Sequence, residues 1–186
     1  MEKNSIISVF SLLVSPKRSW EKISSAPAVK DAVLMRTLFP LAGIAALAVF
    51  IFNLHFTAMR ADSGLENAIR TSAVVFVQFF GTYYITAFLA VKLFEKHVSK
   101  TLCEIYISYL TSLTILFYMA EFALPGYTPY IAALSLYVVY IAWTGSRYFL
   151  KIEDDSANNR FVASVSVMTL ILPAIISLIL RIILPK

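Results

Sequence analysis

Few side chains in this sequence could take part in metal, acid–base or nucleophilic chemistry, and their spacing keeps them apart. The two histidines, His55 and His97, are expected at opposite ends of membrane helices, and Cys103 is the only cysteine. A structural metal site needs several Cys or His ligands at close spacing, which the chain lacks. The phosphate-binding, zinc-protease and serine-hydrolase motifs are also absent. We therefore expect no enzymatic activity, no metal and no cofactor.

Polar side chains within the apolar segments offer a different chemistry, the binding of a polar group inside the membrane. Six residues on the expected second, third and fourth helices form such a set: Gln78, Thr82, Thr111, Tyr137, Tyr140 and Arg147. In one interpretation they form hydrogen bonds between helices, worth about 0.6 kcal/mol each. In the other they line a polar cleft for a lipid headgroup or a small solute, with Arg147 as the anion contact at its inner mouth. Arg147 also fits an interface anchor beside Trp143.

Five apolar segments must position these residues. They cover residues 37–59, 71–91, 105–120, 129–146 and 161–180, and each is close to the ~20 residues that cross a hydrocarbon core of ~30 Å. The composition agrees, since 59% of the residues are hydrophobic and the mean hydropathy is +0.77. Only helices satisfy their own backbone groups there. We predict an all-α integral membrane bundle of five transmembrane helices, with a kink at Pro173 in the last one.

The basic residues predict how the chain is threaded through the membrane. If the N-terminus is cytoplasmic, twelve of the 16 Lys and Arg residues fall on the cytoplasmic side, and the other four are Arg60, Arg70, Arg181 and Lys186. Cytoplasmic segments of membrane proteins carry such an excess. We predict a cytoplasmic N-terminus and, with an odd number of spans, a C-terminus outside. The net charge of +5 then reflects topology, and no nucleic-acid partner is expected.

Residues 1–33 form a cytoplasmic N-terminal amphipathic segment in this prediction, and residues 34–186 form the five-span domain. Residues 6–14 are apolar with regularly spaced serines, which predicts a short helix in the inner interface or docked on the bundle. A second short helix over 17–25 combines a tryptophan with basic residues, as interfacial anchors do, and each cation adds ~1 kcal/mol on an anionic leaflet. The residues predicted to contact the membrane or a partner are Pro16, Lys17, Arg18, Trp20, Lys22 and Ile23.

The string Leu12-Leu13-Val14-Ser15-Pro16-Lys17-Arg18-Ser19-Trp20-Glu21-Lys22-Ile23 resembles the opening of bacterial members of the Yip (Ypt-interacting protein) family. Pro40 in the first span, Tyr109 in the third and the five-span layout are also similar to that family. Its eukaryotic members carry a longer N-terminal region with an aspartate-leucine-x-glycine-proline motif and act in vesicle traffic through Rab GTPases. This chain lacks that motif, so the resemblance implies a bacterial inner-membrane protein.

The first functional expectation is a non-enzymatic membrane scaffold or adaptor. It would bind an unidentified membrane or cytoplasmic protein, or the anionic inner leaflet of the lipid bilayer, through its N-terminal segment. The alternative is a small transporter, channel or lipid-handling subunit that uses the polar cleft between the second, third and fourth helices. Either role is compatible with a homo-oligomer. The expected location is the bacterial inner (plasma) membrane, with a eukaryotic ER or Golgi membrane as the alternative.

Overall fold

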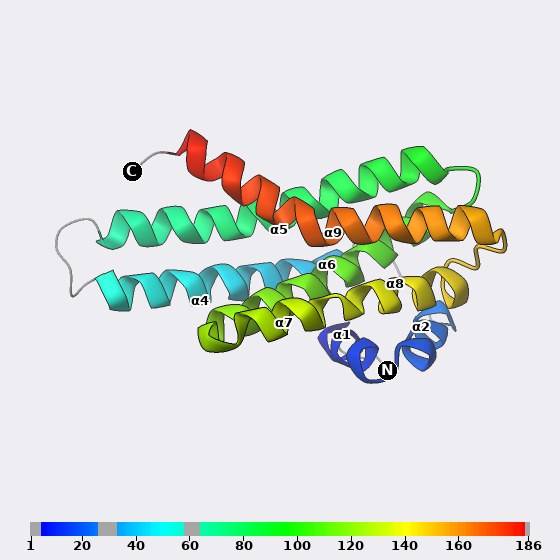
Figure 1. Ribbon diagram of the computed structural model, residues 1–186, viewed down its shortest axis with the longest axis horizontal. Helices are drawn as coiled ribbons and strands as arrows, with labels where there is room; N and C mark the ends of the chain where they lie inside the picture. Colours follow the sequence, from blue (N-terminus) through cyan, green and yellow to red (C-terminus); the bar gives the residue numbers. More distant parts are fainter. Residues whose placement is uncertain (1–4, 26–32, 58–63, 185–186) are drawn as a thin grey trace.

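The computed structural model describes residues 5–25, 33–57 and 64–184, and this part of the chain contains helices and no strands. Figure 1 shows the helices side by side in an elongated bundle. In chain order they are α1 (Ser5–Val14), α2 (Pro16–Ser25), the π-helical turn η1 (Leu34–Leu38), α4 (Phe39–Thr57), α5 (Gly64–Phe94), α6 (Lys100–Ala123), the 3₁₀ turn η2 (Pro125–Tyr127), α7 (Thr128–Ser135), α8 (Tyr137–Tyr148) and α9 (Asp155–Ile183). The prediction of an all-α fold is confirmed.

Four stretches of helix are long and apolar enough to cross a membrane, which confirms the membrane bundle. They are Leu34–His55, Gly64–Phe94, Lys100–Ala123 and Asp155–Ile183. They correspond to the first, second, third and fifth apolar segments of the sequence. The first begins earlier than predicted, and the π-helical turn η1 precedes Pro40 at the start of α4.

The fourth apolar segment is two shorter helices, and here the structure differs from the single continuous span that the sequence predicts. The break falls at Leu136, whose N–H donates to the carbonyl of Ala133 at 3.2 Å in place of a residue four positions back. Ser135 just before it donates its hydroxyl to the carbonyl of Ala132, a side-chain bond that tends to bend helices. Figure 1 shows α7 and α8 following one another along one side of the bundle.

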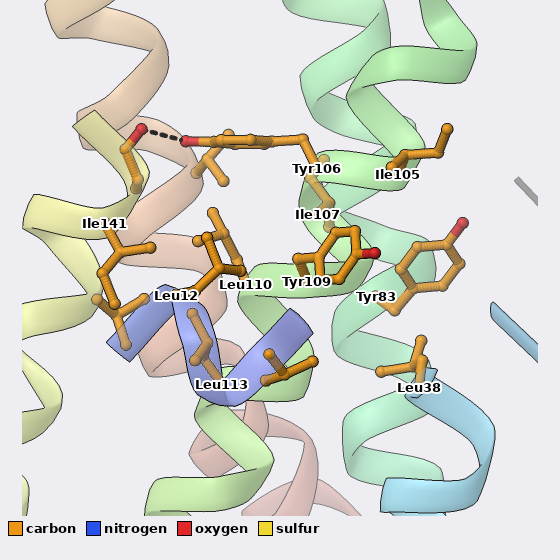
Figure 2. Close-up of a cluster of buried hydrophobic side chains, with 14 of the residues drawn as sticks. Leu12, Leu38, Tyr83, Ile105, Tyr106, Ile107, Tyr109, Leu110, Leu113 and Ile141 are labelled. Carbon is orange, nitrogen blue, oxygen red and sulfur yellow. Dashed lines mark hydrogen bonds between the residues drawn. The ribbon is translucent and has the colours of Figure 1, made fainter. Parts of the chain in front are cut away.

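Helix α6 forms the centre of the molecule. In the most apolar stretch of α6, 78% of the residues are buried, whereas the corresponding share for α9 is 28%. The difference arises because most of the other helices pack around α6. Figure 2 shows α6 side chains, among them Tyr109, Leu110 and Leu113, next to Leu12 of α1 and Ile141 of α8. The outer surfaces of α4, α5 and α9 expose apolar side chains, as helices surrounded by lipid do.

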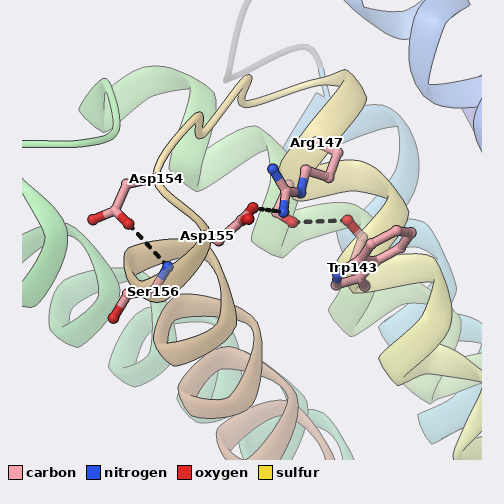
Figure 3. A network of polar contacts seen from close by, with 6 residues as sticks. Trp143, Arg147, Asp154, Asp155 and Ser156 are labelled. Carbon is pink, nitrogen blue, oxygen red and sulfur yellow. Dashed lines mark hydrogen bonds and ion pairs between the residues drawn. The ribbon is translucent and has the colours of Figure 1, made fainter.

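Helix α9 covers α5 and is bent in its middle. Its first turn is capped by Asp154, whose carboxylate accepts a hydrogen bond from the N–H of Ser156 at 2.9 Å (Figure 3). Pro173 lies inside the helix and is buried, and Figure 1 shows the helix changing direction in its middle. The predicted kink at Pro173 is therefore present. Beyond it, Ile176 packs closely against Gly81 of α5.

The two short N-terminal helices are docked on the bundle. Helix α2 packs against α8, and α1 packs against α2, η1 and α6 (Figure 1). Val9 and Leu12 face the bundle and are fully buried, whereas Ile7, Phe10 and Val14 are exposed. Docking was one of the two placements that the sequence left open. Residues 1–4 and 26–32 of the predicted N-terminal segment lie outside the described residues.

Candidate ligand-binding site

The polar cleft predicted between the second, third and fourth spans does not form as expected, because Tyr140 is on the outside. Tyr140 is 51% exposed, and its ring stacks on that of Tyr137 with the centroids 5.4 Å apart. Both belong to the first turn of α8, just after the helix break. Tyr140 therefore lies on the surface of that helix, whereas Tyr137 is half-buried against the core, and the pair does not line a cleft with Gln78.

Arg147 is occupied by contacts at the end of the bundle where α8 ends and α9 begins. Its guanidinium forms an ion pair with Asp155 at the start of α9, and it lies 5.9 Å from the ring centroid of Trp143 (Figure 3). The interpretation of Arg147 as an anion contact is thus replaced by a structural one: the residue links the end of α8 to the first turn of α9.

Most of the buried hydroxyls bond within their own helices and do not join neighbouring ones. Thr82 donates to the carbonyl of Gln78 at 2.7 Å, and the same pattern of bonding four residues back recurs along α6, α8 and α9. The Thr111 hydroxyl is buried without a hydrogen-bond partner among the described residues. Among the six predicted residues only Arg147 forms a hydrogen bond to a neighbouring helix, so the predicted bonds between helices through the hydroxyl and amide groups of the other five are not present among the described residues.

Trp20 is a core residue and not the interfacial anchor that the sequence suggested. Its side chain is fully buried, and its indole N–H donates to the carbonyl of Ile141 at 3.0 Å. The rings of Tyr106, Tyr109 and Phe149 surround it at centroid distances of 5.3 to 5.8 Å. Burying the large ring together with its polar N–H fixes α2 against α8.

The other residues of the N-terminal set divide between the interior and the surface. Pro16 and Ile23 are buried, whereas Lys17, Arg18 and Lys22 are exposed. The Lys17 ammonium lies 4.7 Å from the ring centroid of Tyr148, and hydrogen bonding to that side chain raises the pKa of Lys17 above its usual value. The three cations are thus the part of the set that a leaflet or a partner can reach.

A polar pocket of about 490 Å³ lies between α4, α5, α6 and α9, at the end of the bundle opposite the N-terminal helices. This size is typical of sites for small ligands. We call it the arginine pocket, and its polar lining consists of Asn53, Asn67, Arg70, Thr71, Gln78, Tyr118, Ser177 and Arg181. No carboxylate is present among the described residues that line it, so the pocket carries the charge of two guanidinium groups.

The two arginines come from different helices, and both line the pocket. Arg70 is half-buried on α5, and its guanidinium donates to the carbonyl of Leu184 at 3.2 Å and to the side-chain oxygen of Asn67 at 3.1 Å. Arg181 is exposed in the last turn of α9. Within the described part of the chain neither forms a salt bridge. Both keep N–H groups for a further acceptor, since a guanidinium has five.

Neutral hydrogen-bonding groups continue the pocket inward. Asn53 donates its amide to the Thr71 hydroxyl at 3.1 Å, which joins α4 to α5. Gln78 lies two turns deeper and lines the pocket, although the residue as a whole is only 4% exposed. Its amide is not among the fully enclosed polar groups that lack a partner. The amide is therefore available to the polar atoms of an occupant of the pocket.

An apolar groove of about 750 Å³ lies next to the arginine pocket. The groove and the pocket share three lining residues, Val49, Tyr118 and Phe122. We call it the α4–α6 groove. Its remaining lining is almost entirely apolar and comprises Ala45, Ala48, Ile51, Phe52, His55, Met119, Ala123 and Pro125. Phe52 and Phe122 in this lining pack edge to face, with their ring centroids 4.8 Å apart.

The described residues contain no group of three or more His, Cys, Asp or Glu side chains that could hold a metal ion. Cys103 is buried in α6 and forms no disulfide. No family model, curated protein or solved structure matches the chain. The arginine pocket is thus the candidate site on the strength of its own geometry.

Sequence reasoning identified Gln78 but missed most of this site, above all its two arginines. Asn67, Arg70, Thr71 and Gln78 occur at helical spacing along one face of α5, which was a usable signal. Arg70 and Arg181 were counted only as residues of the outer side. Their convergence depends on how α9 crosses α5, and the sequence pattern does not specify that crossing.

Proposed function

We propose that this protein binds the anionic group of a ligand in the arginine pocket and acts as a non-enzymatic lipid- or solute-handling subunit of the membrane. The observation that carries the proposal is that Arg70 and Arg181, from different helices, line one pocket together with Gln78. This differs in location from the cleft expected between the second, third and fourth helices, although the class of function is the same.

The chemistry of the pocket supports a phosphate or carboxylate group as the ligand. A guanidinium offers a planar fork of N–H groups that matches these anions, and each charge-assisted hydrogen bond contributes about 1.5–3 kcal/mol. Two guanidinium groups without a facing carboxylate among the described lining residues would repel each other, and an anion between them removes that repulsion. Asn67, Thr71 and Ser177 supply additional polar atoms around it.

The test uses glycerol phosphate and detergent-purified protein. We expect glycerol phosphate to raise the thermal unfolding midpoint of the wild type by a few degrees, because a ligand that binds only the folded state stabilises it. The Arg70→Gln, Arg181→Gln double variant should lose the shift. Arg160→Gln serves as the control, since it removes one exposed arginine near the start of α9. An equal shift in the double variant would rule out the arginine pocket as the anion site.

An adaptor role is the second candidate, and the exposure of Lys17, Arg18 and Lys22 favours it. The buried Trp20 holds α2 in place while these cations face outward. Membership of the Yip family stays a prediction that fits this role. Reversing the three charges to glutamate should leave folding intact and abolish recovery of a partner from native membranes. Unchanged recovery would argue against the adaptor.

A further inference from the structure

We infer that the ligand of the arginine pocket is an anionic phospholipid, held with its phosphate between Arg70 and Arg181 and one acyl chain in the α4–α6 groove. This inference rests on the proposed function and adds the class of ligand. It depends on the juxtaposition of a cationic pocket and an apolar groove that share one wall, formed by Val49, Tyr118 and Phe122.

The dimensions of the groove fit one leaflet of a bilayer. Along α4 it extends from Ala45 to His55, which corresponds to about 15 Å at 1.5 Å per residue. This is half of a hydrocarbon core of ~30 Å. The groove ends at Pro125 and His55, on the same end of the bundle as the two arginines. A lipid of that leaflet can therefore place its chain in the groove and its headgroup at the pocket.

The lining changes from polar to apolar between the pocket and the groove, as a phospholipid does between its headgroup and its acyl chain. Next to the headgroup position lie Asn67 and Ser177, whose amide N–H and hydroxyl groups donate to no other described residue and can donate to phosphate or ester oxygens. The groove beyond Phe122 is lined by alanine, phenylalanine and other apolar side chains, which offer nothing to a small hydrophilic anion. A soluble phosphate would use only the pocket and leave the groove without a role.

The charge of the pocket selects among lipids. A zwitterionic headgroup carries an ammonium as well as a phosphate, and the described lining residues include two guanidinium groups and no carboxylate to receive it. Repulsion between like charges therefore disfavours phosphatidylcholine, whereas phosphatidylglycerol brings only the negative charge.

The test reconstitutes the full chain in phosphatidylcholine vesicles with a trace of phosphatidylglycerol that carries a photoreactive diazirine in one acyl chain. After irradiation, mass spectrometry maps the labelled peptides. We expect residues 45–55 and 119–123 to be labelled above the lipid-exposed surface of α9. Excess unlabelled phosphatidylglycerol should remove this enrichment, and additional phosphatidylcholine should not.

Variants test whether the labelling depends on the two arginines and on the open groove. The Arg70→Gln, Arg181→Gln double variant should weaken the enrichment about tenfold or more, since charge-assisted hydrogen bonds are lost. Ala48→Phe, which fills the groove, should also remove it, whereas Leu47→Phe on the exposed face of α4 should not. Each protein is first checked for an unchanged unfolding midpoint. A variant that fails this check is replaced by Arg70→Lys or Ala48→Leu.

The contradicting results are distinct for the two proposals. Uniform labelling of all exposed helix faces by the wild type, with glycerol phosphate still stabilising it, would overturn the lipid and leave the anion site. An unlabelled groove, as expected if a second copy of the chain covers it, would overturn the lipid as well. The absence of both glycerol phosphate stabilisation and labelling would overturn the lipid and the proposed function together.

Discussion

At the scale of single residues, the contact between Trp20 and Gly145 decides how the N-terminal helices attach. An ideal Cβ at Gly145 would lie 2.6 Å from Cε2 of Trp20 and 2.7 Å from Cε2 of Tyr106. Only a residue without a side chain lets α2 and α6 approach α8 so closely. Trp20 fills the resulting space and donates its N–H to the carbonyl of Ile141.

We therefore expect Gly145→Ala to destabilise the protein by about 1–3 kcal/mol, because the added methyl group overpacks the contact with Trp20. Thermal unfolding followed by tryptophan fluorescence measures the effect. Gly43→Ala on α4 is the matched control, since nothing lies within 4 Å of its ideal Cβ. Equal unfolding midpoints for the two variants would contradict the close packing described here.

At the scale of elements, two irregular helices shape the bundle. The kink at Pro173 redirects the second half of α9, which carries Ser177 and Arg181 to the arginine pocket. The break at Leu136 turns the fourth apolar segment into α7 and α8. The kink in α9 occurs at a proline, which is visible in the sequence. The break at Leu136 has no proline or glycine next to it. The sequence accordingly predicts the kink but not the break.

We expect Pro173→Ala to weaken anion binding without preventing membrane insertion. For a kink of about 20°, and with Arg181 about 12 Å further along the helix, straightening α9 would move its guanidinium by about 4 Å. The stabilisation by glycerol phosphate should then decrease. Val167→Leu, on an exposed position of the same helix, is the control. Full stabilisation in Pro173→Ala would show that the kink does not position Arg181.

At the scale of the whole molecule, the ends of the bundle differ in chemistry. The exposed cations of α2 and the ion pair of Arg147 with Asp155 lie at one end, and the arginine pocket lies at the other. The positive-inside prediction places the first end in the cytoplasm and the pocket outside. Native Cys103 cannot report on this orientation, because it is fully buried.

Two introduced cysteines in a Cys103→Ser background test the orientation. An impermeant maleimide applied to intact cells should label Gly126→Cys, which is exposed at the pocket end. It should label Lys96→Cys, exposed in the turn after α5, only after permeabilisation. The reverse pattern would invert the topology and move the arginine pocket to the cytoplasmic side.

The sequence predicts more of the fold than of the binding site. Long apolar segments predict membrane helices because the bilayer forces each backbone to satisfy itself. A binding site depends on which helix faces meet, and stripes of Thr, Gln and Tyr fit more than one arrangement. Tyr140 belonged to such a stripe and faces outward, whereas Arg70 and Arg181 belonged to none and converge. Trp20 shows the same limit of prediction from sequence, because a tryptophan fits both a membrane interface and a buried core.

The central claim is that Arg70 and Arg181 together bind an anionic ligand, and calorimetric titration of the detergent-purified protein tests it most directly. Short-chain phosphatidylglycerol should bind saturably with one site per chain, and short-chain phosphatidylcholine should bind far more weakly. Replacing both arginines by glutamine should weaken phosphatidylglycerol binding about tenfold or more. Equal affinity for the two lipids, or an affinity that the substitutions leave unchanged, would contradict the claim.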